Sequence, residues 1–277
     1  PENIIDSMAK GDILPIIFFA ILFGFFISQV TDNYRQPLTN FFEGMFEVMM
    51  KVTMFIIRFT PLGILGIVSH EVVRNSDKLA NIVGSMAIYM LTVAIGLIIH
   101  ATITLPLILK FIARANPLKH FKNMVTPLLT AFSTASSGAT LPLTMEAVEH
   151  KSGVSNKITS FTLPLGATIN MDGTALYECV AAIFIAQVYG VELTVTQQVI
   201  IVFTALLASI GAAGIPMAGL VMITIVLTAV NLPLEGVGLI IAVDLILDMM
   251  RTTVNVWSDS CAAVTIARSE GEETLVR

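Results

Sequence analysis

The chain has 277 residues, of which 55% are hydrophobic and only 13% are charged, and its formal net charge is −5. Soluble domains carry roughly 25% charged residues, so this composition excludes an ordinary soluble domain and predicts an all-α polytopic membrane protein whose partner is a lipid bilayer. No basic run indicates nucleic acid as a partner, and the two cysteines lie in apolar segments without metal-ligand spacing.

The N-terminal part of the chain predicts three long helical segments. Residues 13–30 hold no charge and are about as long as the shortest spanning helix. Residues 38–73 form a longer mixed segment, in which the TPLG at 60–63 predicts a kink. The next span lies within 79–112 and contains His100, which we interpret as a packed or lipid-facing residue rather than a ligand.

Two later stretches are apolar but interrupted. Residues 124–145 contain SSGATLP at 136–142 between two apolar arms, and residues 197–230 contain ASIGAAGIPMAG at 208–219. Each arm is too short to cross ~30 Å of hydrocarbon at ~1.5 Å per residue, and clustered Gly and Pro do not sustain a helix. Both stretches are therefore predicted to be re-entrant helical hairpins.

The span at 158–188 is predicted to be a broken helix, because its centre reads GATINMDGTALYE. This centre brings Asn170, Asp172 and Thr174 to mid-membrane, where irregular backbone is tolerated only if it is buried in protein or lines a cavity. Glu178 follows in the same span. It is either a proton carrier or a glutamate that contacts water near the helix exit, and the sequence leaves both open.

The last span, 237–267, carries a polar stripe on an otherwise apolar helix. Its members, spaced by three or four residues, are Asp244, Asp248, Arg251, Asn255 and Asp259. Arg251 offers a planar fork to a carboxylate, Asp248 can take an ammonium group, and the oxygens of Asn255 and Asp259 suit Na⁺. The alternative is internal salt bridging of Arg251 with Asp244 or Asp248.

The Lys and Arg pattern predicts an orientation. The loops around 110–122 and 149–157 are basic and Arg268 lies at the start of the C-terminal tail, whereas no Lys or Arg occurs between Lys157 and Arg251. By the positive-inside rule the first hairpin enters from the cytoplasm and the second from the outside. Broken half-helices that meet near the midplane are typical of secondary transporters.

Together the four motifs NMDGT, ASIGAAGIPMAG, SSGATLP and DMMRTTVNVWSD resemble those of the glutamate transporter family of dicarboxylate/amino acid:cation symporters. The resemblance covers the whole chain, from the family's fourth helix to its eighth. It implies a homotrimer with an elevator mechanism, in which 1–74 are scaffold and trimerisation helices and 79–277 are the transport domain. The family's first three helices are missing, so we expect the chain to be a fragment.

The resemblance also assigns roles to individual residues. It implies that the substrate is bound by Arg251, Asp248, Asn255, Thr174, Ser136, Ser137, Thr252 and Gly214. It implies three sodium sites. Gly166, Asn170, Asn255 and Asp259 match the first, the backbone carbonyls of Thr168, Ser209, Ile210 and Ala212 match the second, and Asn170 and Asp172 match part of the third; Met171 is also expected among the sodium-binding residues. Glu178 matches the glutamate linked to proton coupling, Asp244 is expected to support Arg251, and no organic cofactor is implied.

Contrasts within the family narrow the substrate. Neutral amino acid members tend to replace the arginine at 251, and dicarboxylate members tend to lack an aspartate at 248. The presence of both Arg251 and Asp248 favours L-aspartate or L-glutamate as the substrate. Asp259 favours Na⁺ as the coupled ion over purely proton-driven transport. Relatives usually carry a further arginine where this chain has Ala135 or Met249.

The sequence therefore predicts a non-enzymatic symporter in the cell membrane. The alternatives are a neutral amino acid or dicarboxylate symporter of the same family, or a passive conduit. An intramembrane aspartyl protease built on Asp172 and Asp259 is disfavoured, because no protease-type motif is present.

Overall fold

The computed structural model describes residues 3–10, 13–59, 62–63, 65–66, 69, 79–212 and 218–276. Every regular element in these ranges is a helix, which confirms the all-α class. The chain divides into two compact units, Pro1–Asp77 and Lys78–Arg277. The assignment of 1–74 as scaffold and 79–277 as transport domain stays a prediction.

Among its described residues, the first unit contains α1 (Ile4–Lys10), α2 (Ile13–Ile27) and α3 (Asp32–Ile57). The helix predicted at 13–30 ends earlier than expected, because a turn follows Ile27, and α3 begins before residue 38 with an acidic first turn that its dipole favours. Phe23 and Phe42 hold α2 against α3 edge to face, with ring centroids 5.9 Å apart. The kink expected at 60–63 falls partly on residues outside the described ranges.

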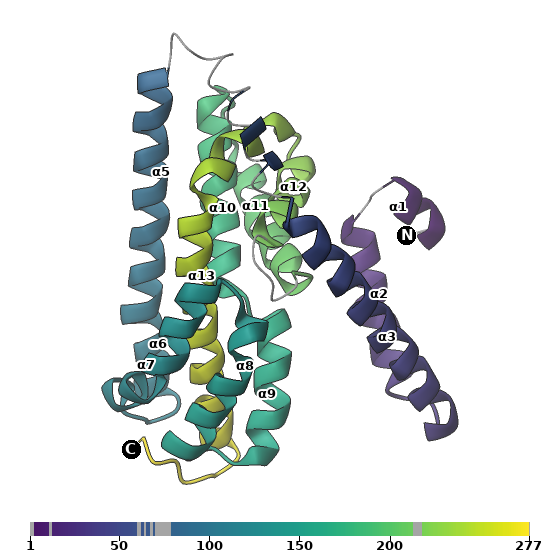
Figure 1. The fold of residues 1–277 in the computed structure, drawn as a ribbon, viewed down its shortest axis with the longest axis vertical. Coiled ribbons are helices and arrows are strands. Elements are labelled where there is room, and N and C mark those ends of the chain that lie inside the picture. Colours follow the sequence, from purple (N-terminus) through teal and green to yellow (C-terminus); the bar gives the residue numbers. More distant parts are fainter. Residues whose placement is uncertain are drawn as a thin grey trace. The chain divides into compact units, whose positions relative to one another are not determined.

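The second unit is a bundle around its last helix (Figure 1). Its α-helices are α5 (Leu79–Ile99), α6 (Leu105–Phe111), α7 (Pro117–Thr134), α8 (Ser137–Glu146), α9 (Asn156–Ile169), α10 (Asp172–Val188), α11 (Val195–Ile210), α12 (Ala218–Ala229) and α13 (Val237–Ser269). Two π-helical turns, η2 (His100–Thr104) and η3 (Ala147–Lys151), and the 3₁₀ turn η4 (Leu234–Gly236) complete it. Helix α13 contacts α5 to α10 and α12, so the polar stripe lies at the centre of the bundle.

Both interrupted stretches form helix–turn–helix pairs. Helices α7 and α8 pack against each other across Ala135, which adopts a left-handed conformation with φ of 48°. Helices α11 and α12 also pack together, and the helix α11 ends where the glycine-rich motif begins. Because α8 has 10 residues and α12 has 12, neither is long enough to span a bilayer. Re-entry into the membrane itself stays a prediction.

The helix predicted at 158–188 is broken where the sequence indicates. Helix α9 ends at Ile169 and α10 begins at Asp172, and between them Asn170 and Met171 take non-helical backbone angles with ψ near 60°. Because of this break, some backbone groups of α9 and α10 have no partner within their own helix. They lie near the middle of α13, which both helices contact.

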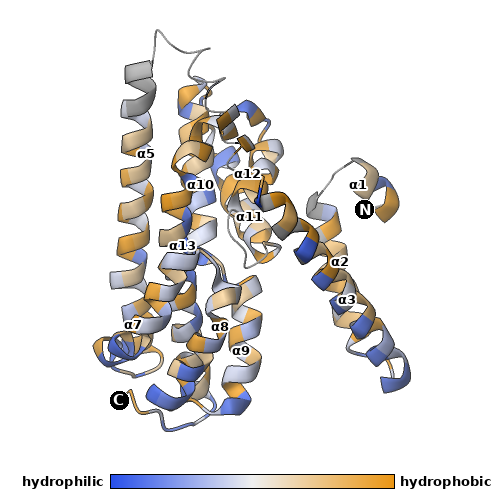
Figure 2. Ribbon diagram, viewed as in Figure 1, coloured by the Kyte–Doolittle hydropathy of each residue, from blue (hydrophilic) through white to orange (hydrophobic). Residues whose placement is uncertain are grey.

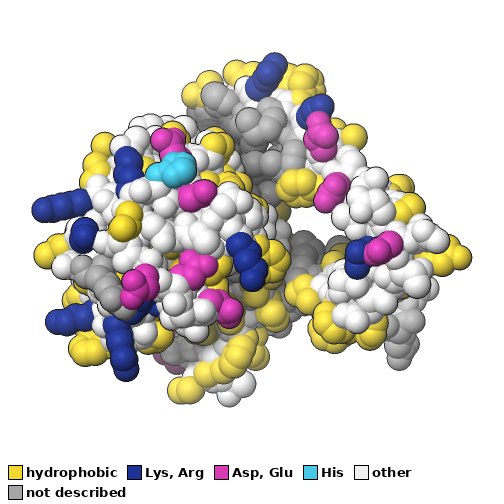
Figure 3. All heavy atoms as spheres, turned by 90° about the horizontal axis from the view of Figure 1, so that it is seen from below, with side chains coloured by type: hydrophobic (Ala, Val, Ile, Leu, Met, Phe, Trp, Pro, Cys, Tyr) yellow, Lys and Arg dark blue, Asp and Glu magenta, His cyan; other side chains and the backbone are white. Residues whose placement is uncertain are grey.

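Charged residues concentrate at one end of the second unit, where the loops after α6 and η3 meet the C-terminal tail. Figure 2 shows hydrophilic residues at that end and mostly hydrophobic helices above it, and Figure 3 shows Lys and Arg side chains around its rim. The tail is tied down there: the Asn116 N–H donates to the Val276 carbonyl at 2.6 Å, and the Leu275 N–H to the Ser152 carbonyl at 2.9 Å. Hydrogen bonds from Ser155 to Glu272 lower the pKa of that carboxyl group.

Candidate functional site

Arg251 is the centre of the candidate site, although only 1% of its surface is exposed. Its Nη1 lies 3.0 Å from Asp244 Oδ1, and its Nη2 lies 2.9 Å from Asp248 Oδ1. The ring of Tyr177 on α10 lies 4.2 Å from the guanidinium carbon and adds a cation–π contact. The internal salt bridging that the sequence left open is therefore present, and it involves both aspartates.

Helix α12 closes over the guanidinium at Gly219. A Cβ added at this glycine would lie 2.8 Å from Arg251 Cζ, which is closer than real Cβ atoms approach a neighbour. The start of α12 therefore lies directly against Arg251 because residue 219 has no side chain. Any larger occupant beside the guanidinium requires this part of the α11–α12 pair to move away.

A small cavity of about 20 Å³ adjoins Arg251. It is lined by Ala135, Ser137, Met171, Thr174, Ala218, Gly219, Asp248, Arg251, Thr252 and Asn255. Six of the residues predicted to bind substrate are thus brought together from α8, α10 and α13. Of the other two, Ser136 is buried beside this lining, and Gly214 lies outside the described residues. The cavity has room for about one water molecule.

The first turn of α8 adjoins this cavity, because Ser137 is part of its lining. The Ser136 hydroxyl accepts a hydrogen bond from the Ala139 N–H at 3.2 Å and so caps the helix. The Ser137 hydroxyl donates to the Ala167 carbonyl of α9 at 3.3 Å, which holds the turn against the broken helix. Helix N-termini favour anions, because unpaired N–H groups and the helix dipole both act there.

The lower half of the stripe meets the helix break. Asn170 Nδ2 donates to Asp259 Oδ1 at 2.9 Å and to the Ser258 hydroxyl at 3.1 Å. A Cβ added at Gly166 would lie 2.6 Å from the same Asp259 oxygen, so the α9 backbone touches this carboxylate. Three of the four residues predicted for one sodium site are therefore in mutual contact, and Asp259 is only 4% exposed.

Asn255 joins the two halves of the site. Its Oδ1 accepts from the Gly173 N–H at 2.8 Å, and its Nδ2 donates to the Thr174 hydroxyl at 3.0 Å. Both partners lie in the first turn of α10, directly after the break. Asn255, which was predicted to bind both substrate and sodium, thus holds the first turn of α10, including the predicted substrate residue Thr174.

The residues predicted for a second sodium site lie on α9 and at the end of α11, two helices that contact each other. Ser209 and Ala212 are buried, whereas Thr168 and Ile210 are partly exposed. The hydroxyl groups of Thr168 and Ser209 each donate to a carbonyl of their own helix, at 2.8 and 2.9 Å. These bonds use the hydroxyl protons and leave the hydroxyl oxygens as acceptors.

His100 makes a contact that was not predicted from the sequence. Its Nε2 lies 2.5 Å from Asp172 Oδ2, across 72 residues of sequence. Asp172 was predicted to contribute to a third sodium site together with Asn170. The interpretation of His100 as a merely packed or lipid-facing residue is therefore incomplete. Only its position at membrane depth could have drawn attention to it.

Glu178 lies inside the bundle and is fully buried. Neither carboxyl oxygen has a hydrogen-bond partner among the described residues. The alternative that Glu178 contacts water near the helix exit does not agree with this burial. An ionised carboxylate without donors is costly to bury, whereas the neutral acid costs far less.

A family model described as the sodium:dicarboxylate symporter family matches residues 1–269. Excitatory amino acid transporter 1 of Bos taurus is 48% identical over 250 residues, which are 90% of this chain and 46% of that protein. Excitatory amino acid transporter 2 of Homo sapiens is 46% identical over 252 residues, which are 91% of this chain and 44% of that protein.

A third relative matches nearly the whole chain. The putative sodium-dependent excitatory amino acid transporter glt-4 of Caenorhabditis elegans is 44% identical over 272 residues, or 97% of this chain and 53% of that protein. The chain thus spans about half the length of the curated relatives that it matches.

Proposed function

The chain belongs to the sodium:dicarboxylate symporter family, and from that premise we propose that it forms the substrate-binding part of a Na⁺-coupled symporter of L-aspartate or L-glutamate. One observation carries the proposal: a buried arginine is paired with two aspartates beside a cavity at a helix break. A dicarboxylate with an ammonium group is the ligand whose charges match this set. The names of the relatives, which are excitatory amino acid transporters, agree with that substrate class.

The substrate would bind by breaking the ion pair between Arg251 and Asp248 and by pairing with both residues itself. Its side-chain carboxylate takes the fork of Arg251 now shared with Asp248, and Asp248 then accepts the substrate ammonium group. The α-carboxylate lies at the first turn of α8, next to Ser136 and Ser137. Because the cavity of about 20 Å³ is far too small for an amino acid, binding requires the α11–α12 pair to open. We propose that this pair, which includes Gly214, is the gate.

The sodium ions would bind at the helix break. Turning the Asn170 amide presents Oδ1 in place of Nδ2, so that Asn170, Asp259, the Gly166 carbonyl and Asn255 offer oxygens to one ion. Backbone carbonyls near Thr168, Ser209, Ile210 and Ala212 form the second site, and Asn170, Met171 and Asp172 form part of the third. Asp244 keeps Arg251 charged and oriented while Asp248 engages the substrate.

The membrane arrangement proposed for the chain follows its hydropathy. Two helical stretches among the described residues, Gly84–Phe111 and Asn156–Val188, are long and apolar enough to cross a bilayer. We place the α7–α8 and α11–α12 pairs as re-entrant hairpins from opposite sides, in a cell membrane. Residues 1–74 serve as the trimerisation scaffold, and 79–277 move as the transport domain of an elevator.

A passive conduit is less well supported. It requires a continuous polar lining, whereas Arg251, Asp244 and Asp248 are paired with one another and at most 3% exposed. Buried charges in such pairs block a pore rather than line one.

Uptake into proteoliposomes tests the proposed function. We expect the full-length protein to accumulate labelled L-aspartate and L-glutamate only when a sodium gradient points inward, because the ion sites and the substrate site share Asn255. Vesicles with potassium replacing external sodium serve as the control. Uptake that proceeds equally well without sodium would contradict the coupling, and uptake of neutral amino acids alone would contradict the substrate.

We also propose that Glu178 carries a proton during transport, because its buried carboxyl group has no donor among the described residues. Replacing Glu178→Gln removes the titratable proton and keeps the shape. We expect aspartate uptake by this variant to be insensitive to external pH, whereas wild-type uptake changes between acidic and neutral pH. Glu235→Gln, at an exposed position, is the matched control. The same pH profile in Glu178→Gln and in the wild type would exclude Glu178 as the carrier.

A further inference from the structure

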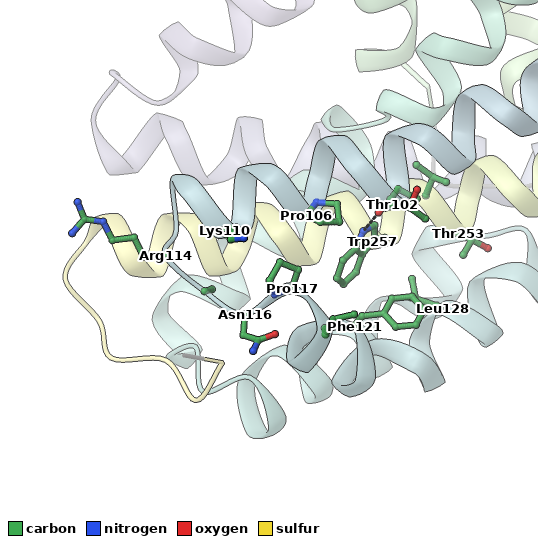
Figure 4. Close-up of a pocket in the computed structure, with 14 residues that line it drawn as sticks. Thr102, Pro106, Lys110, Arg114, Asn116, Pro117, Phe121, Leu128, Thr253 and Trp257 are labelled. Atoms are coloured by element: carbon green, nitrogen blue, oxygen red, sulfur yellow. Dashed lines mark hydrogen bonds between the residues drawn. The ribbon is translucent and has the colours of Figure 1, made fainter.

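A second cavity, of about 870 Å³, lies between the end of α6, the start of α7 and one face of α13 (Figure 4). Its volume falls within the roughly 300–1,000 Å³ of protein sites that enclose small molecules. It shares no lining residue with the cavity beside Arg251. The proposed transport function does not use it.

The chain builds this cavity with a π-helical turn. In η2 the Leu105 N–H donates to the His100 carbonyl, one residue beyond the α-helical pattern. In that register the Ala101 carbonyl would pair with residue 106, which is a proline and has no N–H. The Ala101 carbonyl instead accepts a hydrogen bond from Trp257 Nε1 at 3.1 Å. The indole of α13 is thereby fixed as one wall of the cavity.

The uncharged polar side chains of the lining are already engaged within the chain. The hydroxyls of Thr102 and Thr253 donate to carbonyls one turn earlier, at 2.7 and 2.8 Å. Asn116 Oδ1 accepts from the Lys119 N–H at 3.1 Å and caps α7. The rest of the uncharged lining is apolar, with large surfaces from Phe121 and Trp257. An occupant therefore needs an apolar body.

The two charged residues of the lining are both cations. Lys110 at the end of α6 and Arg114 in the following turn are exposed, and no Asp or Glu lines the cavity. Among the described residues, neither cation has a carboxylate within salt-bridge distance. Figure 4 shows Arg114 reaching outward at the end of the cavity where the chain turns back into α7. Long cationic side chains at the rim of an apolar site typically hold an anionic headgroup.

We propose that this cavity binds one anionic phospholipid, with an acyl chain between Pro106, Phe121 and Trp257 and its phosphate at Lys110 and Arg114. The N-terminal end of α7, which begins at Pro117 beside the two cations, adds to the positive potential at the phosphate. In the proposed orientation this end of the bundle faces the cytoplasmic leaflet, which is rich in anionic lipids. The site is independent of substrate and ions.

The single tryptophan of the sequence makes the proposal directly testable. The full-length protein, with any tryptophan outside residues 1–277 replaced by phenylalanine, is reconstituted in phosphatidylcholine vesicles. Increasing fractions of phosphatidylglycerol or phosphatidylcholine with brominated acyl chains are then added, and bromine quenches the fluorescence of Trp257 on contact. We expect phosphatidylglycerol to be preferred about 25-fold, since each of the two cations near an anionic headgroup contributes on the order of fivefold.

Three variants separate this site from general attraction to the membrane. Lys110→Gln with Arg114→Gln should abolish the preference for phosphatidylglycerol. Lys119→Gln with Lys122→Gln removes two cations of α7 outside the lining and should retain it. Thr253→Phe fills the cavity and should reduce quenching by both lipids. Equal quenching by both lipids in the wild type, a preference retained without Lys110 and Arg114, or a preference lost with Lys119 and Lys122 would each overturn the proposal. None of these readouts requires transport, so they are independent of the proposed function.

Discussion

Replacing Arg251→Cys is expected to abolish measurable binding of L-aspartate and L-glutamate. The guanidinium is 1% exposed and pairs with Asp244 and Asp248, so its loss removes the anchor for the substrate's side-chain carboxylate. It also leaves two buried carboxylates without a cation. Truncating one partner of a buried charge pair costs about 2–5 kcal/mol, which corresponds to at least ~30-fold in affinity. The measurement is the concentration dependence of aspartate uptake.

Arg35→Cys provides the matched control for this variant. Arg35 pairs with Asp32 in α3, and both side chains are largely exposed. Exposed ion pairs contribute about 0–1 kcal/mol, so aspartate uptake by this variant should equal that of the wild type. Elution of the Arg251→Cys protein as the wild-type oligomer shows that it is folded. Wild-type aspartate affinity in folded Arg251→Cys would remove Arg251 from the substrate site. Uptake of neutral amino acids by this variant would agree with its role in selection.

Replacing Asp259→Asn is expected to raise the external sodium concentration that gives half-maximal aspartate uptake by about tenfold or more. Asp259 contacts Asn170 and Gly166 at the helix break and supplies the negative charge of the proposed ion site. An amide keeps one oxygen and the same shape but loses the Coulomb attraction to Na⁺, and a loss of about 1.4 kcal/mol is tenfold in affinity. The readout is aspartate uptake at a series of external sodium concentrations.

Glu270→Gln, on the exposed tail, makes the same chemical change away from the bundle. It should leave the sodium dependence at the wild-type value. If Asp259→Asn also kept that value, Asp259 would not be a sodium ligand, and the ion sites would have to lie elsewhere along the break. If Asp259→Asn transported aspartate without any sodium, the proposed coupling through this residue would be supported in its strongest form.

The resemblance led us to expect a second arginine near the site, and this chain has Ala135 and Met249 at the two positions. Ala135 lines the cavity beside Arg251 but has no polar side chain, and Met249 is not part of that lining. Arg251 has two aspartate partners within the described site. In the proposed binding mode, the substrate carboxylate competes with these two carboxylates for one guanidinium group.

Local sequence determined the helices and their interruptions. The apolar composition indicated an all-α membrane protein. Glycine, proline and polar residues predicted the break at Asn170 and an interruption at 136–142, whereas the turn lies at Ala135 and most of 136–142 belongs to α8. The spacing from Asp244 to Asp259 predicted one polar face because an α-helix repeats every 3.6 residues. The structure places that face against the break, where Asn170 meets Asp259.

Only the tertiary structure decided which partner each polar group has. Helical period fixes the face on which a residue lies, but it does not specify which residue of another helix will lie opposite. For this reason the contact of His100 with Asp172, the closure of Gly219 over Arg251 and the hydrogen bond from Trp257 to Ala101 could not be read from spacing. Each joins residues distant in the sequence through helix packing. The same packing decides that Arg251 has both aspartates as partners while Glu178 has none among the described residues.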